Sequence, residues 1–153
     1  MVLTYHNKIM ANILGISEAV GLALHTVDLL GKSDRLLTTA ELAGNLEVSV
    51  HHLAKVHQRL VKSGLLVSTR GPAGGFQLAR LPEDIRLVEI IESVQGPFHP
   101  NTCLLGRDRC IRGSCMLGGL ARQIHNQIRS FFEMKTVKEL IDSGNEPGEE
   151  GFC

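Results

Sequence analysis

Three of the chain's four cysteines lie within one short segment, at Cys103, Cys110 and Cys115. The segment is also rich in glycine and arginine. Thiols at this density can ligate a metal ion or an iron–sulfur cluster, form a disulfide, or act as a redox-reactive site. Zinc would be satisfied by three cysteines and one further ligand, but the paired CxxC spacing of many zinc sites is absent. Thiols that bind nothing are a further interpretation, and the residues alone leave these alternatives open.

The composition of the 153-residue chain indicates one domain with an extension. Hydrophobic residues make up 43% of it, and the core must be mostly aliphatic because the chain has one Tyr and no Trp. No apolar run reaches the roughly 18 residues that cross a bilayer, and the N-terminus lacks the order of a signal peptide. We therefore expect a cytoplasmic protein with no membrane partner. In that compartment thiols stay reduced, and clustered cysteines more often serve metals or redox chemistry than structure.

The net charge of zero conceals a strong segmentation. Residues 45–80 carry five basic side chains and one acidic one, and residues 103–135 carry six basic and two acidic side chains. Residues 136–153 reverse this balance, with one Lys against five acids. Local basic surfaces of this kind are typical of nucleic-acid binding, whereas the average charge of the chain carries little information.

Two short helices with defined starts are predicted within residues 38–63. Thr38 and Glu41 have the spacing of a capping box, which should open the first helix. Ser49 is a natural N-cap for the second helix, which should run to Ser63. The polar side chains of this second helix fall on one outward face, at His51, Lys55, Gln58 and Lys62. Two such helices joined by a tight turn form a helix-turn-helix pattern.

A β-hairpin is predicted next, with strands at Leu65–Thr69 and Phe76–Ala79. The six residues between the strands include three glycines and a proline, which favours a tight turn. A helix-turn-helix followed by a hairpin is a winged helix. Further helices are expected at residues 13–30 and 83–94 from the spacing of their apolar residues. The expected fold class is therefore mainly α, with a small β-hairpin wing.

The wing strengthens the prediction of DNA binding. Basic residues on a helix face are usually only solvated, but a flexible Gly-rich turn with an arginine suits contact with phosphates or the minor groove. The start of the second helix of a helix-turn-helix is the part that meets base edges. The histidines at this position can equally be ordinary surface residues. The candidate DNA contacts are Ser49, His51, His52, Lys55, Arg59, Arg70, Gly71, Gly74 and Gly75.

A long helix is predicted after the cysteine segment. Its apolar positions step by four, three, four and three residues, at Leu117, Ala121, Ile124, Ile128 and Phe131. That spacing of about 3.5 residues is the seam of helices that pack in a coiled-coil-like pair. So broad an apolar stripe needs a partner, and a second copy of the chain is the expected one. A final short helix should begin at a second capping box, formed by Thr136 and Glu139.

Taken together, these features resemble the Rrf2 family of winged-helix transcriptional regulators. The resemblance is carried by Ala40–Ala43, by residues 48–67, and above all by the wing sequence Ser68-Thr-Arg-Gly-Pro-Ala-Gly-Gly-Phe-Gln-Leu-Ala-Arg80. It covers roughly residues 14–141. It implies a homodimer, binding to palindromic operators in double-stranded DNA, and a long C-terminal helix that crosses between subunits. It also implies an iron–sulfur cluster, of the 2Fe–2S or 4Fe–4S type, because the cluster-binding branches have three cysteines at this place.

The resemblance implies Cys103, Cys110 and Cys115 as cluster ligands, with a fourth ligand from elsewhere. In one branch a His follows the third cysteine by three residues, but this chain has Gly118 there. In the nitric-oxide-sensing branch a first-helix carboxylate from the other subunit has this role, and Glu18 is at the matching position. The unequal intervals between the cysteines also depart from the family pattern. Weaker alternatives for the fourth ligand are His99 and Cys153.

The sequence thus predicts a DNA-binding transcriptional regulator whose operator binding is controlled by an iron–sulfur cluster that senses redox, nitric oxide or iron–sulfur status. The alternative is a repressor of the same fold without a cluster, controlled by thiol redox or by a partner protein. An iron–sulfur electron-transfer protein is disfavoured by the Arg70 wing, and an enzyme by the lack of a nucleophile–base pair or phosphate-binding loop. The predicted segments are an N-terminal arm (1–12), the winged helix-turn-helix (13–96), the cysteine loop (97–116), the dimerisation and terminal helices (117–142) and an acidic tail (143–153).

Overall fold

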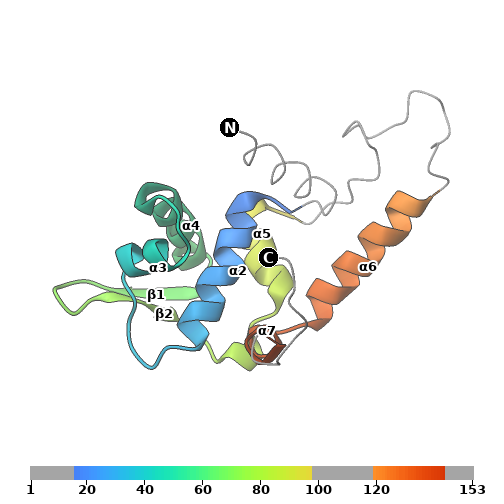
Figure 1. Cartoon of the computed structure of the whole chain (residues 1–153). Helices are drawn as coiled ribbons and strands as arrows, with labels where there is room; N and C mark the ends of the chain where they lie inside the picture. Colours follow the sequence, from blue (N-terminus) through green and yellow to red (C-terminus); the bar gives the residue numbers. More distant parts are fainter. Residues whose placement is uncertain (1–15, 98–118, 144–153) are drawn as a thin grey trace.

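The computed structural model describes residues 16–97 and 119–143 of the chain. It confirms the expected fold class, because helices dominate and a two-stranded antiparallel hairpin forms the wing (Figure 1). None of the helices formed by these residues has the length and apolar character that crossing a membrane requires. In chain order the elements are α2 (Glu18–Gly31), α3 (Thr39–Asn45), α4 (Val50–Lys62), β1 (Leu66–Thr69), β2 (Gly75–Leu78), the 3-10 turn η1 (Pro82–Asp84), α5 (Leu87–Gln95), α6 (Leu120–Met134) and α7 (Val137–Ser143).

The helix-turn-helix is formed by α3 and α4, and both helices begin where the caps predict. The Thr38 hydroxyl accepts a hydrogen bond from the Glu41 N–H at 3.2 Å, and the Glu41 carboxylate accepts one from the Thr38 N–H at 2.8 Å. The Ser49 hydroxyl accepts a hydrogen bond from the His52 N–H at 3.1 Å. These caps satisfy backbone N–H groups that the start of a helix leaves without an intrahelical acceptor.

The wing is the hairpin of β1 and β2, with Leu66 opposite Leu78 at its base. Leu37, just before α3, adds a third short segment by exchanging two backbone hydrogen bonds with Phe76, at 3.2 and 2.8 Å. A Cβ on Gly75 would lie 2.8 Å from the Leu37 carbonyl oxygen, so this close approach of two backbones requires glycine. The hairpin is thereby fixed to the start of the helix-turn-helix.

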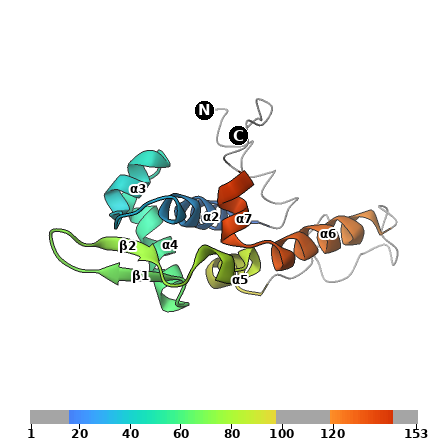
Figure 2. The ribbon, with the colours of Figure 1, turned by 90° about the horizontal axis from the view of Figure 1, so that it is seen from below.

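One core holds the winged helix together, and it is aliphatic as the composition predicts. The long helix α2 lies at its centre and contacts α4, α5, α7 and β2 (Figures 1 and 2). Burial of apolar surface of this kind supplies most of the driving force for folding. The largest fully buried side chains are Leu42, Leu53, Leu60, Leu65, Leu66, Ile85, Ile90, Ile91 and His57. His57 is the polar exception among them.

The helix α5 begins later than the sequence predicts. The expected start at residue 83 falls in the 3-10 turn η1, and α5 starts at Leu87. Long-range pairing is the cause, because the Leu87 N–H donates to the Lys135 carbonyl at 3.0 Å and the Val137 N–H donates to the Ile85 carbonyl at 2.9 Å. This exchange holds the backbone before α5 extended and joins it to the segment between α6 and α7.

The helix α6 projects away from the body of the winged helix (Figures 1 and 2). Ile128 and Phe132 pack against the core. The predicted apolar seam is therefore divided, since one side of the stripe faces the core and the other faces solvent. The exposed side chains are Leu120, Ile124, Phe131 and Met134, with exposed fractions of 51%, 38%, 51% and 67%.

Candidate nucleic-acid interface and the flanks of the cysteine segment

The helix α4 presents the predicted DNA contacts at its start. Ser49, His51 and Lys55 are exposed, and His52 is half-buried. The first turn of α4 contains no acidic side chain. The positive end of the helix dipole therefore stays available to a phosphate. The predicted outward face is confirmed, because all four of its residues are exposed: His51, Lys55, Gln58 and Lys62.

Arg70 lies at an exposed position where the wing turns. Gly71, which follows it, has a φ of 114°, a conformation that residues with a side chain rarely adopt. A Cβ on Gly74 would lie 2.2 Å from the Thr69 carbonyl oxygen. The backbone of the turn thus explains these glycines, and their consequence is a compact tip that presents the Arg70 guanidinium. The tip extends beyond α3 (Figures 1 and 2).

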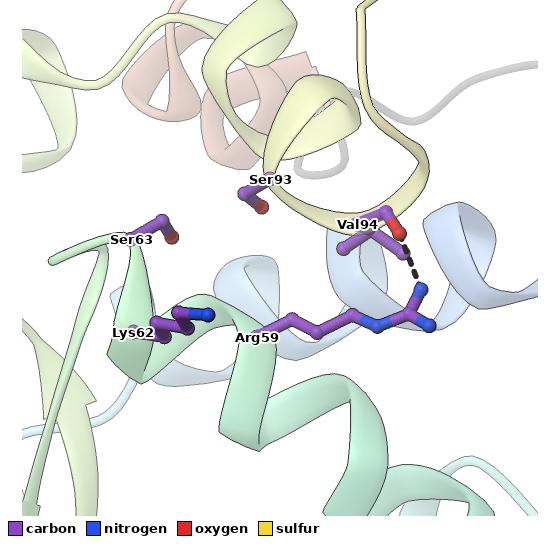
Figure 3. A pocket seen from close by; sticks show the side chains of 5 residues that line it. All are labelled: Arg59, Lys62, Ser63, Ser93 and Val94. Carbon is purple, nitrogen blue, oxygen red and sulfur yellow. Dashed lines mark hydrogen bonds between the residues drawn. The ribbon is translucent and has the colours of Figure 1, made fainter.

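Arg59, another predicted DNA contact, reaches from α4 to α5. Its Nη1 donates a hydrogen bond to the Val94 carbonyl oxygen in the last turn of α5 (Figure 3). The guanidinium is therefore engaged with the protein. The ends of the two helices border a cleft of about 400 Å³ that is lined by Arg59, Lys62, Ser63, Ser93 and Val94.

His57 is a buried residue of α4 that was not among the predicted site residues. Its Nδ1 lies 3.2 Å from the Thr39 hydroxyl, and its ring centroid lies 4.7 Å from that of Phe76. Burial lowers the pKa of the imidazole to about 4. A neutral ring therefore joins α3, α4 and the wing. Its position was readable from the sequence, because it follows Leu53 by four residues and precedes Leu60 by three.

Glu18, the predicted fourth ligand, is exposed in the first turn of α2. Residues 16–17 are not helical, so this helix begins later than the predicted residue 13. The Ser17 N–H donates a hydrogen bond to the Gln95 side-chain oxygen at 3.1 Å. The start of α2 thus lies beside the end of α5, from which the chain continues into the cysteine segment (Figure 1).

The predicted thiol ligands belong to parts of the chain outside the described residues. Of the residues named in the ligand prediction, six lie outside the described ranges: His99, Cys103, Cys110, Cys115, Gly118 and Cys153. Within residues 16–97 and 119–143, no three His, Cys, Asp or Glu side chains gather as a metal site. The donors of the cysteine segment therefore stay predictions from the sequence, while Glu18 has a defined position.

The sequence is similar to that of transcriptional regulators from several bacteria. The Rrf2 family model, described as "Iron-dependent Transcriptional regulator", matches residues 16–143. An HTH-type transcriptional regulator candidate of Aquifex aeolicus is 34% identical, over 71% of this chain and 78% of its own length. Another, of Haemophilus influenzae, is 33% identical over 71% and 73% of the two chains. The HTH-type regulator IscR of Photorhabdus laumondii is 30% identical over 68% of this chain and 63% of its own length.

Solved structures share the fold. CymR, the global cysteine regulator of B. subtilis, has a TM-score of 0.68 at 21% identity, over 84% of this chain and 96% of its own. T. potens IscR has a TM-score of 0.67 at 19% identity, over 89% and 93% of the two chains. The family match extends from the start of α2 through the helix-turn-helix and wing to the end of α7. This chain therefore belongs to the Rrf2 family of transcriptional regulators.

Proposed function

We propose that this Rrf2 regulator is a cytoplasmic homodimer that binds a palindromic operator under the control of an iron–sulfur cluster. The observation that carries the proposal is the hydrogen bond from the Ser17 N–H to the Gln95 side chain, which holds the turn that contains Glu18 beside the last turn of α5. In the sequence, the cysteine segment begins at residue 97, directly after this turn of α5. Three soft thiolates and one carboxylate form a donor set that suits such a cluster. The ligands in this proposal are Cys103, Cys110 and Cys115 of one subunit and Glu18 of the other subunit. The cluster is of the 2Fe–2S or 4Fe–4S type.

In the proposed complex with DNA, the start of α4 enters the major groove. Ser49, His51, His52 and Lys55 then face base edges, as the first residues of a second helix do in other helix-turn-helix proteins. Arg70 contacts the backbone or the minor groove from the wing. The exposure of Ser49, His51, Lys55 and Arg70 and the absence of acids in the first turn of α4 support this arrangement.

In the proposed dimer, a second copy of the chain covers the exposed apolar side chains of α6. Leu120, Ile124 and Phe131 recur at steps of four and seven residues, so they lie on one face of the helix. Exposed apolar side chains grouped in this way mark an interaction surface more often than solvated helix. A two-fold axis would pair the stripe with itself and would place two α4 helices for the two halves of a palindrome.

A bound cluster would supply a centre that reacts with oxidants or nitric oxide, and the cysteine segment and Glu18 would hold it. A change at the Glu18 ligand would act on the start of α2 and, through the hydrogen bond from Ser17 to Gln95, on the end of α5. The iron-dependent description of the family model supports this control. Without a cluster, the same fold would act as a repressor controlled by thiol redox or by a partner protein.

The test is anaerobic purification, followed by a visible spectrum, an iron and acid-labile sulfide count, and operator titrations before and after exposure to air or nitric oxide. We expect coloured protein whose operator affinity changes in step with bleaching. Cys110→Ala should abolish both the absorbance and the regulation, whereas Cys153→Ala is the matched control that keeps them. Colourless protein without iron or sulfide, or a Cys110→Ala variant with intact absorbance and regulation, would refute the cluster model.

A further inference from the structure

Two hydrogen bonds converge on consecutive residues in the last turn of α5. The Val94 carbonyl accepts one from the Arg59 guanidinium of α4. The Gln95 side-chain oxygen accepts the other from the Ser17 N–H at the start of α2, at 3.1 Å. This turn is therefore joined on one side to the helix proposed to contact DNA and on the other to the turn that contains Glu18.

The bond from Arg59 suits the end of a helix. The last carbonyl groups of a helix have no intrahelical donor, and they carry the negative end of the helix dipole. A guanidinium satisfies such a carbonyl with both a hydrogen bond and a charge. α5 ends directly afterwards, because Gly96 has a φ of 85°. The bond thus anchors the point at which the chain leaves the winged helix for the cysteine segment.

The two serines that line the cleft in Figure 3 make hydrogen bonds to the helix that each of them follows or belongs to. The Ser63 hydroxyl donates to the Leu60 carbonyl at 3.0 Å, and the Ser93 hydroxyl donates to the Ile90 carbonyl at 2.7 Å. Among the residues that line the cleft, Arg59 donates a hydrogen bond across it, to the Val94 carbonyl oxygen. A shift of the last turn of α5 relative to α4 would therefore act on this bond first.

We propose that Arg59 is a positioning residue that couples the state of the cysteine segment to the orientation of α4, rather than a phosphate contact. The path runs from Glu18 and Ser17 through Gln95 and the adjacent Val94 carbonyl to Arg59. This inference rests on the proposed cluster function. It replaces the prediction of Arg59 as a DNA contact, and it requires no contact between Arg59 and the operator.

The test compares operator affinity of the cluster-loaded and cluster-free full-length protein, each measured over a range of salt concentrations. Arg59→Met keeps the aliphatic stem of the side chain and removes the donor. Coupling between two sites commonly corresponds to a ratio of about 5- to 150-fold between the two states. We expect Arg59→Met to bring the wild-type ratio to near one, with the salt dependence of binding unchanged.

Lys62→Met is the matched control, because it removes one positive charge from the same turn of α4, and it should keep the wild-type ratio. If Arg59 instead contacts a phosphate, Arg59→Met will weaken both states equally, keep the ratio and lower the salt slope by about 0.9. That result overturns the inference. A merely structural role would lower the unfolding temperature and leave the ratio intact, so thermal unfolding is measured alongside.

Gln95→Met tests the same path from its other end, and it stands in for Arg59→Met if that variant does not fold. It should also bring the ratio of affinities towards one, and a full wild-type ratio in a folded Gln95→Met protein contradicts the path.

Failure of the proposed function gives a different pattern. If wild-type protein has no cluster, or binds the operator with equal affinity in both cluster states, both the proposed function and the inference are refuted. If wild-type protein contains the cluster and its operator affinity depends on the cluster, but Arg59→Met shows the same dependence, only the inference is refuted.

Discussion

Replacing His57 by Phe should make the stability of the winged helix less dependent on pH. The imidazole is 1% exposed, it is packed against Phe76, and its pKa is lowered by burial from 6.5 to about 4. The unfolded chain therefore binds a proton at this residue at higher pH than the folded chain does. A depressed His pKa of this kind means that stability is present above pH 6.5 and is lost as the pH falls towards 4.

The size of this loss follows from the two pKa values. The interval from 6.5 to about 4 corresponds to about 3 kcal/mol of unfolding free energy below pH 4. About 2 kcal/mol of it is lost between pH 7 and pH 5. The low pKa values of Glu41 and Glu139, about 2 in each case, act mainly below pH 4.5 and so outside this range. Hydrogen bonds are the cause there, chiefly from Arg35 to Glu41 and from Lys135 to Glu139.

Urea unfolding at pH 7 and pH 5, at one protomer concentration, measures the effect. Wild-type protein should lose about 2 kcal/mol more over this range than His57→Phe does. His125, whose pKa burial also lowers, is present in both proteins and cancels in the comparison. His51→Gln is the control, because His51 is an exposed histidine of the same helix. Equal losses in wild type and His57→Phe would show that burial of His57 does not govern acid stability.

Three further changes test the wing, the dimer and the source of the fourth ligand. Gly75→Ala should lower the unfolding free energy by about 1–3 kcal/mol, because its Cβ would lie 2.8 Å from the Leu37 carbonyl oxygen. Urea titration measures the loss, with Gly44→Ala as the control, because a Cβ at Gly44 meets nothing within 4 Å. Phe131→Glu should yield monomers in sedimentation equilibrium, whereas Asn126→Asp, on the opposite side of α6, should stay dimeric. Mixed dimers that pair a Glu18→Ala subunit with a Cys110→Ala subunit should keep about half the wild-type iron. When Glu18 serves the other subunit, one of the two sites retains all its ligands. A mixed dimer without iron would show that the carboxylate comes from the same chain as the thiols.

The elements that could be predicted are those determined by neighbouring residues. Thr38 with Glu41, and Thr136 with Glu139, form the reciprocal hydrogen bonds that their spacing predicts. Ser49 caps α4 as expected. A cap depends on three or four consecutive residues, so the same contacts form whatever lies farther along the chain. The helix-turn-helix and the wing were predictable for this reason.

The contacts that could not be predicted join residues far apart in the sequence. The start of α5 is determined by Lys135 and Val137, which lie beyond the whole cysteine segment. Arg59 is among the candidate DNA contacts as a basic residue of the second helix, and nothing near it in the sequence indicates a bond to Val94, 35 residues away. His57 differs, because its inward position was visible in the helical spacing and only its partners were not.

Glu18 shows where a sequence argument for a ligand needs the structure. An acidic residue in the first turn of a helix is explained equally well by the helix dipole, which any carboxylate in that turn would satisfy. A ligand, in contrast, must have its carboxylate at one place. The bond from Ser17 to Gln95 holds the backbone of the turn that contains Glu18 beside the end of α5. An acid moved from Glu18 to the exposed N-cap, as Ser17→Asp combined with Glu18→Ala, would therefore keep the dipole interaction and remove the ligand. Iron content then separates two explanations that stability alone would not.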